Sequence, residues 1–330
     1  RRQRHAGASV PRTSAPCRRG MSKVVDARIA QLGNQARVRA GSLITTVFGD
    51  TVLPRGGRIW LGSLIGLLQP LGLGDRLVRT SVFRLAKDEW LYAEAHGRKA
   101  DYVLSPVGQR RFEEASRQIY ALRTPQWDGR WRLILSLGEL DIRRREALRR
   151  ALFWQGFGTV GADCFVHPSA DLDTVFDALQ AEGLGDVRPR LMPLLSADMP
   201  SVDTATAASL VQRAWNLDAL AEAYGDFVRF YRPLLNELTR PRGKGLSDET
   251  AFLARVLLIH DYRRLLLRDP ELPDELLPAD WPGHRARELC ADIYRRLLDP
   301  SESHLDRHML LADGRVPSAD PALTHRFSPD

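Results

Sequence analysis

The stretch Leu73–Leu91, LGDRLVRTSVFRLAKDEWL, joins a turn signal, an amphipathic helix and the entry to a strand. Gly72 and Gly74 interrupt the preceding apolar run. Asp75 is the expected N-cap, because its carboxylate can accept hydrogen bonds from the free N–H groups at a helix N-terminus. The helix is predicted to run from Arg76 to about Lys87, and the N-terminal part of the chain is organised around it.

The two faces of this helix differ in chemistry. One face is apolar or small at helical spacing and consists of Val78, Ser81, Val82 and Leu85. The other is basic or hydroxylic, has no acidic residue, and consists of Arg76, Arg79, Thr80, Arg84 and Lys87. Such a stripe supplies donors for phosphate oxygens and for the guanine edge, as a DNA recognition helix requires.

Two alternatives remain open at this point. An arginine-rich surface helix in an unrelated α/β protein has the same pattern, so the flanking segments are needed to decide. Phe83 also falls on the basic face. It is expected either to be buried by a neighbouring element, which is the favoured interpretation, or to offer an apolar contact to a thymine methyl group.

Two helices are predicted before this stretch. The apolar face of the first, which begins near Arg37, consists of Leu43, Ile44, Val47 and Phe48. Residues 51–59 form a Pro/Gly-rich connection, and a second apolar helix covers residues 60–68. The basic helix is therefore the third in the series.

A β-hairpin is predicted directly after the third helix. Residues 90–96 and 100–104 are strand-like, and the turn between them carries Arg98 and Lys99 at its tip. Taken alone, these two side chains fit a solubilising turn. After three helices, however, the hairpin takes the place of the wing in a winged helix-turn-helix domain, where a basic tip lies against a phosphate or the minor groove.

The charge of the chain is divided unevenly along its 330 residues. Residues 1–125 contain 22 Lys and Arg side chains against 9 Asp and Glu, whereas residues 126–330 contain 26 against 32. Basic clustering attracts phosphate whatever the base sequence. The asymmetry favours a polyanion-binding front end joined to domains with another task.

The sequence supports neither a membrane protein nor a metal-binding protein. The longest apolar run, residues 60–73, contains Gln69 and Pro70 and is shorter than a membrane span, so we expect a cytoplasmic protein with no membrane partner. The three cysteines, Cys17, Cys164 and Cys290, show neither a disulfide framework nor zinc-ligand spacing. No metal and no cofactor is expected.

The pattern divides the chain into five segments. Residues 1–36 are expected to be a basic, disordered extension, and residues 1–20, with six arginines, read either as a basic arm or, preferably, as sequence upstream of a true start at Met21. Residues 37–124 form the winged helix-turn-helix domain, residues 125–200 a central domain, residues 201–310 a helical effector and dimerisation domain, and residues 311–330 a tail with disordered final residues.

The central domain shows a β-α-β-α-β order. The predicted elements are strands at 131–137, 158–167 and 187–195, with helices at 141–154 and 172–181. This order predicts a ferredoxin-like α/β domain with one strand left unplaced. The arginine-rich helix could hold DNA or an acidic partner, but a solvated face is the favoured interpretation. The C-terminal helices are predicted at 207–238, 248–268 and 285–298, so the whole chain is of the α+β, multidomain class.

Four stretches resemble the PaaX family of transcriptional repressors, the regulators of phenylacetic acid degradation. They are SLITTVFGDTVLPRGGRIWLGSLIGLL (42–68), RLVRTSVFRLAKDEWL (76–91), YVLSPVGQRRF (102–112) and IHDYRRLLLRDPELPDELLPADWPG (259–283). The similarity extends over about residues 37–310. It implies a homodimeric, non-enzymatic repressor that binds double-stranded operator DNA of a phenylacetate or related aromatic catabolic operon. It also implies release by an aryl-CoA thioester, typically phenylacetyl-CoA.

Candidate effector residues lie in the last of these stretches. CoA offers phosphates and an adenine, so its receptor needs basic side chains, aromatic walls and an apolar slot. His260, Arg264 and Arg268 share a helical face at i, i+4 and i+8. The neighbouring candidates are Tyr262, Arg263, Trp281 and His284. The alternative is a structural network in which Asp261 and Asp269 pair with the arginines around a buried tyrosine and tryptophan.

Two rival functions are considered. The central fold is also that of small Cas2-type nucleases, but a lone Glu139 after the first strand is too little for a metal-dependent hydrolase, and no acyl-transfer motif appears elsewhere. The second rival keeps the regulator and changes the ligand to a different acyl-CoA or to none.

Overall fold

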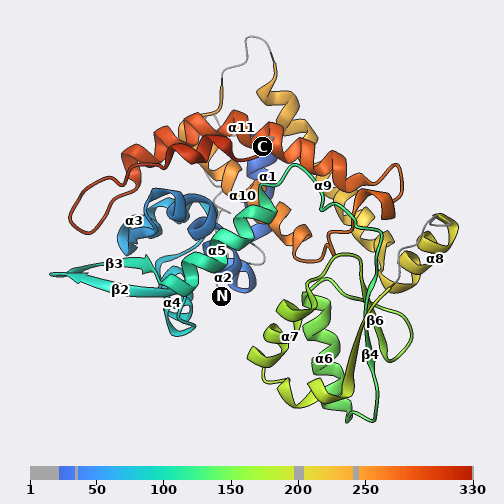
Figure 1. The fold of residues 1–330 in the computed structure, drawn as a ribbon. Helices are drawn as coiled ribbons and strands as arrows, with labels where there is room; N and C mark the ends of the chain where they lie inside the picture. Colours follow the sequence, from blue (N-terminus) through green and yellow to red (C-terminus); the bar gives the residue numbers. More distant parts are fainter. Residues whose placement is uncertain (1–21, 34–35, 197–203, 241–244, 329–330) are drawn as a thin grey trace, which may run out of the picture.

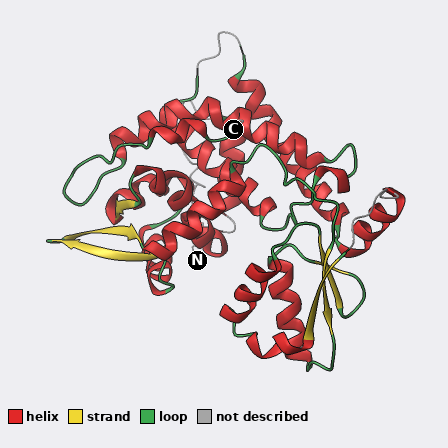
Figure 2. Ribbon diagram, viewed as in Figure 1, coloured by secondary structure: helices red, strands yellow, loops and turns green. Residues whose placement is uncertain are grey.

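The computed structural model describes residues 22–33, 36–196, 204–240 and 245–328 (Figure 1). Most of this chain is helical, and its strands form two small sheets at opposite sides of the molecule (Figure 2). One sheet belongs to the N-terminal part and the other to the central part. The C-terminal helices lie between and above them.

The N-terminal part follows the predicted order with additions. Its elements are α1 (Lys23–Gly33), α2 (Ala36–Val47), β1 (Arg58–Trp60), α3 (Leu61–Leu68), α4 (Asp75–Lys87), β2 (Leu91–His96), β3 (Lys99–Leu104) and α5 (Pro106–Ile119). The short strand β1, missed in the sequence, pairs with β3 and gives the antiparallel order β1-β3-β2. The three helices and the hairpin that the sequence predicts are confirmed.

Helix α4 forms for the predicted reason but with a different cap. Val78 and Val82 are fully buried, so the apolar stripe holds the helix on the core. The residue at the N-cap position is Gly74, which has no side chain to offer. Asp75 already lies in the first turn and accepts a hydrogen bond from Arg79 Nε at 2.5 Å. The predicted capping role of Asp75 is therefore wrong.

The segment before Arg37 is not simply an unstructured extension. Residues 1–21 lie outside the described part, but α1 is a helix whose Val25 and Leu32 are buried. Arg28 on its outer side forms an ion pair with Asp261. The expectation of disorder is wrong for residues 22–33, because two apolar residues seven apart were enough to anchor a short helix.

The central part is a four-stranded antiparallel sheet with two helices on one face. Its elements are β4 (Arg132–Ser136), α6 (Ile142–Trp154), β5 (Gly158–Thr159), β6 (Cys164–His167), α7 (Leu172–Ala181) and β7 (Leu191–Leu195). The strand order is β5-β6-β4-β7. The single strand predicted at 158–167 is in fact the hairpin β5-β6, which supplies the strand that the pattern left unplaced. The core of this part is separate from the main core and includes Ile134, Leu152 and Phe165.

Four long helices make up the C-terminal part: α8 (Thr204–Ala214), α9 (Leu217–Leu238), α10 (Asp248–Leu266) and α11 (Pro282–His308). The helix predicted at 207–238 is broken into two, because Asn216 caps α9 by accepting from Ala219 N. Helix α11 continues through Pro300 and is longer than predicted. Leu323 and Phe327 are buried, so the predicted disorder of the tail is wrong as far as residue 328.

The N-terminal and C-terminal parts share one hydrophobic core. Helix α10 is the centre of this core, with every residue from Thr250 to His260 buried. It packs against α2 on one side and α11 on another. Because close-packed interiors transmit displacement, this shared core connects the basic helix rigidly to the C-terminal part.

Candidate functional site

The basic face of α4 is open to solvent. Its five predicted residues, Arg76, Arg79, Thr80, Arg84 and Lys87, are all exposed, while the opposite stripe is buried. Arg79 pairs with Asp75, but both side chains are more than half exposed, so the pair is weak. Among the described residues, no ion pair involves Arg76, Arg84 or Lys87. Three cations are thus free to meet phosphates or base edges.

Phe83 is 67% exposed within this basic face. The prediction of burial is wrong, because the hairpin that follows α4 leaves this position uncovered. Phe83 shares the face with Arg79 and Lys87, each four positions away. An exposed aromatic ring on this basic face is an apolar contact surface within a cationic one.

The β2-β3 hairpin projects from the body beside α4 (Figure 1). Arg98 and Lys99 are exposed at its tip, next to Gly97, whose φ of 61° makes the tight turn. Lys99 Nζ lies 4.4 Å from the ring centroid of Trp60. Midway along the hairpin, the buried Asp101 accepts a hydrogen bond from Ala312 N, which ties the hairpin to the C-terminal segment. The tip is therefore held at a fixed position relative to α4.

Three of the effector candidates, His260, Tyr262 and Trp281, are buried in the core. Nδ1 of His260 lies 3.2 Å from Thr46 Oγ1 of α2, and its Nε2 is buried without a partner among the described residues. Burial, aided by the charge of Arg263, lowers the pKa of His260 to about 3. Trp281 packs edge-on against Tyr224. These three residues fit the structural network better than a ligand cavity.

The remaining candidates point in different directions. Arg263 donates to the backbone oxygen and the hydroxyl of Ser42, and so joins α10 to α2. His284 lies at the surface and contacts Asp274 at 2.9 Å. Only Arg264 and Arg268 lie together, in a groove between α1, α9 and α10 of about 580 Å³. The seven candidates do not share one cavity.

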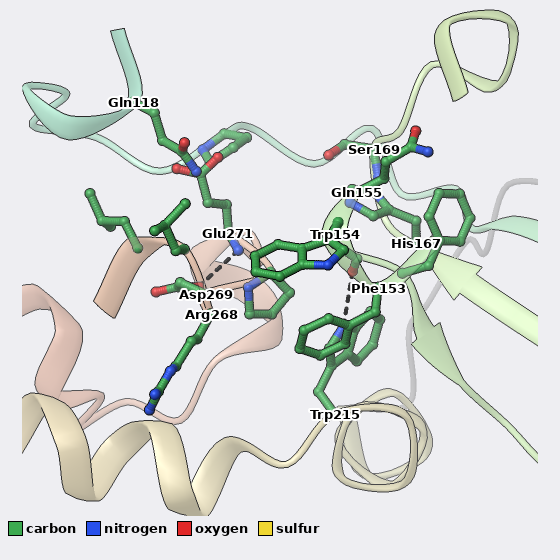
Figure 3. A pocket seen from close by; sticks show the side chains of 16 residues that line it. Gln118, Phe153, Trp154, Gln155, His167, Ser169, Trp215, Arg268, Asp269 and Glu271 are labelled. Atoms are coloured by element: carbon green, nitrogen blue, oxygen red, sulfur yellow. Dashed lines mark hydrogen bonds between the residues drawn. The ribbon is translucent and has the colours of Figure 1, made fainter. Parts of the chain in front are cut away.

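A second cavity, of about 300 Å³, lies where all three parts of the chain meet (Figure 3). Its walls come from the end of α5, the segment after α6, the end of β6, the start of α9 and the segment after α10. Of the predicted candidates only Arg268 reaches it. The sequence signal that could have revealed it is the aromatic run Phe153–Phe157, FWQGF, at the end of an otherwise arginine-rich helix.

A buried charged cluster joins the base of the N-terminal part to the C-terminal helices. Arg255 of α10 and Asp50, in the turn after α2, are both almost fully buried and form an ion pair. Tyr120, Tyr294 and Arg326 also bond to the Asp50 carboxylate. No pattern in the sequence indicates this cluster, because its members are scattered between positions 50 and 326.

The described residues contain no helix long and apolar enough to cross a membrane. Within the same ranges no group of three or more His, Cys, Asp or Glu side chains is placed to hold a metal ion.

Comparisons with known proteins agree over most of the chain. Residues 39–108 match the PaaX-like protein family, residues 124–197 the PaaX protein central Cas2-like domain, and residues 215–307 the PaaX-like protein C-terminal domain. The chain is 38% identical over 308 residues to the transcriptional repressor PaaX of Escherichia coli strain K12, covering 93% of this chain and 95% of that protein. A solved structure, the uncharacterized protein Rv0674 from Mycobacterium tuberculosis, matches 73% of this chain and 89% of its own with 25% identity and a TM-score of 0.46.

Proposed function

Because the chain belongs to the PaaX family of transcriptional repressors, we propose that it represses a phenylacetate or related aromatic catabolic operon by binding its operator DNA. An aryl-CoA thioester such as phenylacetyl-CoA releases it. The observation that carries the DNA part is the exposed face of α4, on which Arg76, Arg84 and Lys87 have no ionic partner among the described residues.

The N-terminal part acts in this proposal as a winged helix-turn-helix domain. Helix α4 enters the major groove, where its arginines reach guanine edges and its threonine reaches phosphates. The β2-β3 hairpin is the wing, and Arg98 and Lys99 contact the backbone beside it. The three-stranded sheet and the attachment of the hairpin at Asp101 support this assignment. The central part, with strand order β5-β6-β4-β7, takes the ferredoxin-like role of connecting and pairing copies.

A homodimer presents two such helices. Two copies read half-sites about one helical turn apart, roughly 34–36 Å, or a multiple of that distance. The effector then acts by binding the arrangement that does not fit the operator more tightly than the one that does. Only this difference in affinity can shift the population away from DNA.

A gel-shift titration tests the proposal. The DNA is taken from upstream of the gene itself and of a neighbouring aromatic-catabolism operon, at fixed salt, with and without phenylacetyl-CoA. A specific shift that the thioester abolishes is expected. A specific shift that the thioester does not change would support the repressor assignment and would point to a different acyl-CoA or to no ligand. The absence of a shift on every such DNA would overturn the repressor assignment.

A further inference from the structure

The cavity at the junction of the three parts has an aromatic wall that little else explains. Phe153 and Trp154 at the end of α6 are 54% and 65% exposed, although they stand next to the buried Phe157 and Trp215. Figure 3 shows Trp154 with Trp215 on one side and Asp269 and Glu271 on the other. Exposed aromatic rings that border a concave site favour an apolar, planar ligand group.

The backbone of this wall is built for close approach. Gly156 has a φ of 82°, and a Cβ at this position would lie 2.9 Å from Nε2 of His167 and 3.3 Å from the oxygen of Pro270. Trp215 Nε1 donates to the carbonyl oxygen of Gly156 at 3.0 Å, which fixes the turn. The central part and the C-terminal part are therefore in close contact at Gly156, directly beside the cavity.

Two side chains at the wall, His167 and Gln155, carry N–H groups for which the described residues show no acceptor. Nδ1 of His167 accepts hydrogen bonds from Ser169 N and Ala170 N, so the proton of the neutral ring is on Nε2. Burial and the nearby Arg132 lower the pKa of His167 to about 4, which keeps the ring neutral at physiological pH. Nε2 of Gln155 is buried without a partner among the described residues. A carbonyl oxygen in the cavity would satisfy such donors.

The cavity adjoins the basic groove described above. Arg268 lines both, and Figure 3 shows its side chain extending away from Asp269 and out of the aromatic cluster. In the groove, Arg28 and Arg229 are paired with acids, whereas Arg264 and Arg268 have no ionic partner among the described residues. An apolar slot with carbonyl-binding donors thus opens next to two free guanidinium groups suited to phosphates.

We propose that the aryl-acyl end of a CoA thioester occupies the cavity of Phe153, Trp154, Gln155 and His167, and that its phosphates lie on Arg264 and Arg268. The ring stacks on the exposed aromatic side chains, and the thioester oxygen accepts from His167 Nε2 or Gln155 Nε2. This placement rests on the proposed release by an aryl-CoA and goes beyond it by naming the site. It replaces the scattered candidates with one continuous surface.

The site also has a physical connection to α4. Glu271, at its rim, lines the cavity together with Gln118 near the end of α5. In the middle of α5, Phe112 packs edge-on against Trp90, whose backbone N–H donates to Leu85 O near the end of α4. A ligand that moves the central part against α5 therefore acts on a helix that contacts the segment directly after the recognition helix.

Isothermal calorimetry on the full chain tests the site, with phenylacetyl-CoA, free CoA and phenylacetate as probes. Trp154→Ala and Gln155→Leu are expected to weaken phenylacetyl-CoA binding about tenfold or more and to leave free CoA binding unchanged, since they remove contacts to the aryl-acyl end only. Arg268→Ala is expected to weaken both thioester and free CoA. Ile142→Ala and Arg150→Ala, exposed positions on α6 away from the cavity, are the matched controls.

The outcomes distinguish a failure of the proposed site from a failure of the proposed function. If the wild-type protein binds phenylacetyl-CoA and all three site variants bind it equally well, the site is wrong and the effector assignment stands. If the wild-type protein binds none of the thioester while it still shifts operator DNA, the effector assignment fails and the site fails with it. Circular dichroism of each variant confirms that a loss of binding is not a loss of fold.

Discussion

Arg255 of α10 and Asp50, in the turn after α2, form an ion pair 2.9 Å long with side chains that are 0% and 1% exposed. Arg255 also donates to the backbone oxygen of Asp50, and the hydroxyl of Tyr120 donates to the same carboxylate. Removing one partner from such a pair leaves an uncompensated buried charge. The pair therefore locks the base of the DNA-binding part onto the central helix of the C-terminal part.

Arg255→Met should destabilise the protein by about 3 kcal/mol, because Met fills similar volume but leaves Asp50 with less positive charge. The measurement is urea unfolding at neutral pH. Arg229→Ala is the control, since its pair with Asp226 is exposed on both sides and should contribute less than about 1 kcal/mol. Equal unfolding midpoints for the two variants would mean that the buried pair is not a structural lock.

Arg84→Ala should weaken operator binding by about 1–3 kcal/mol if Arg84 makes a bidentate base contact. Arg79→Ala should act in the same direction. Fluorescence anisotropy with labelled operator DNA at fixed salt measures both, and Arg150→Ala on the central part serves as the charge-matched control. Wild-type affinity in both folded α4 variants would exclude α4 as the recognition helix.

Changing Arg98 and Lys99 together to Ala should reduce the salt dependence of operator binding. Two lost phosphate contacts lower the slope of log Kd against log salt by about 1.8, while base preference is kept. Binding titrations from low to high salt give the slope directly. Loss of sequence discrimination with an unchanged slope would argue against a phosphate role for the hairpin tip.

Phe83→Ala should change DNA specificity and not stability. The ring is 67% exposed, so its removal is expected to cost no more than about 0.5 kcal/mol of folding free energy. Operator affinity should fall relative to affinity for random DNA, with the salt slope unchanged, because an apolar contact releases no counterions. A variant with the wild-type ratio of specific to random binding would place Phe83 outside the interface.

Acid should destabilise the protein partly through His260. Its pKa is about 3 in the folded protein, below the ordinary value of 6.5, so between these two pH values the unfolded state binds the proton and the folded state does not. Stability is therefore complete above pH 6.5 and falls as pH drops, by at most about 1.4 kcal/mol per pH unit from this group. His260→Gln should show a shallower fall in urea-unfolding free energy over this range; an identical slope would mean that His260 titrates normally.

The sequence predicted those elements that have their own periodicity. Local pattern alone predicted three such elements: the apolar stripe of α4, the alternation and glycine turn of the β2-β3 hairpin, and helix α7. Strand β1 and the β5-β6 hairpin were missed, since two- and three-residue strands carry no period and form only by pairing. The prediction that Phe83 is buried was wrong, because the burial of this side chain depends on a neighbouring element rather than on α4 itself.

The effector site was harder to predict for the same physical reason. Helical spacing predicted that His260 and Arg268 lie on one face. In the structure, His260 packs against Thr46, whereas Arg268, about two turns further along the chain, lines the open cavity. The cavity gathers residues from five segments between Gln118 and Glu271. Their proximity is a product of tertiary packing, and no spacing in one segment could reveal it.

The most direct test of the account is a linkage measurement on one protein sample. Calorimetry gives the affinity of phenylacetyl-CoA for the free protein and for the operator-bound protein, and anisotropy gives operator affinity with and without the thioester. We predict that each ligand weakens the other by the same factor, about 5- to 150-fold. Equal thioester affinity for free and operator-bound protein, with operator affinity unchanged, would contradict release by an aryl-CoA.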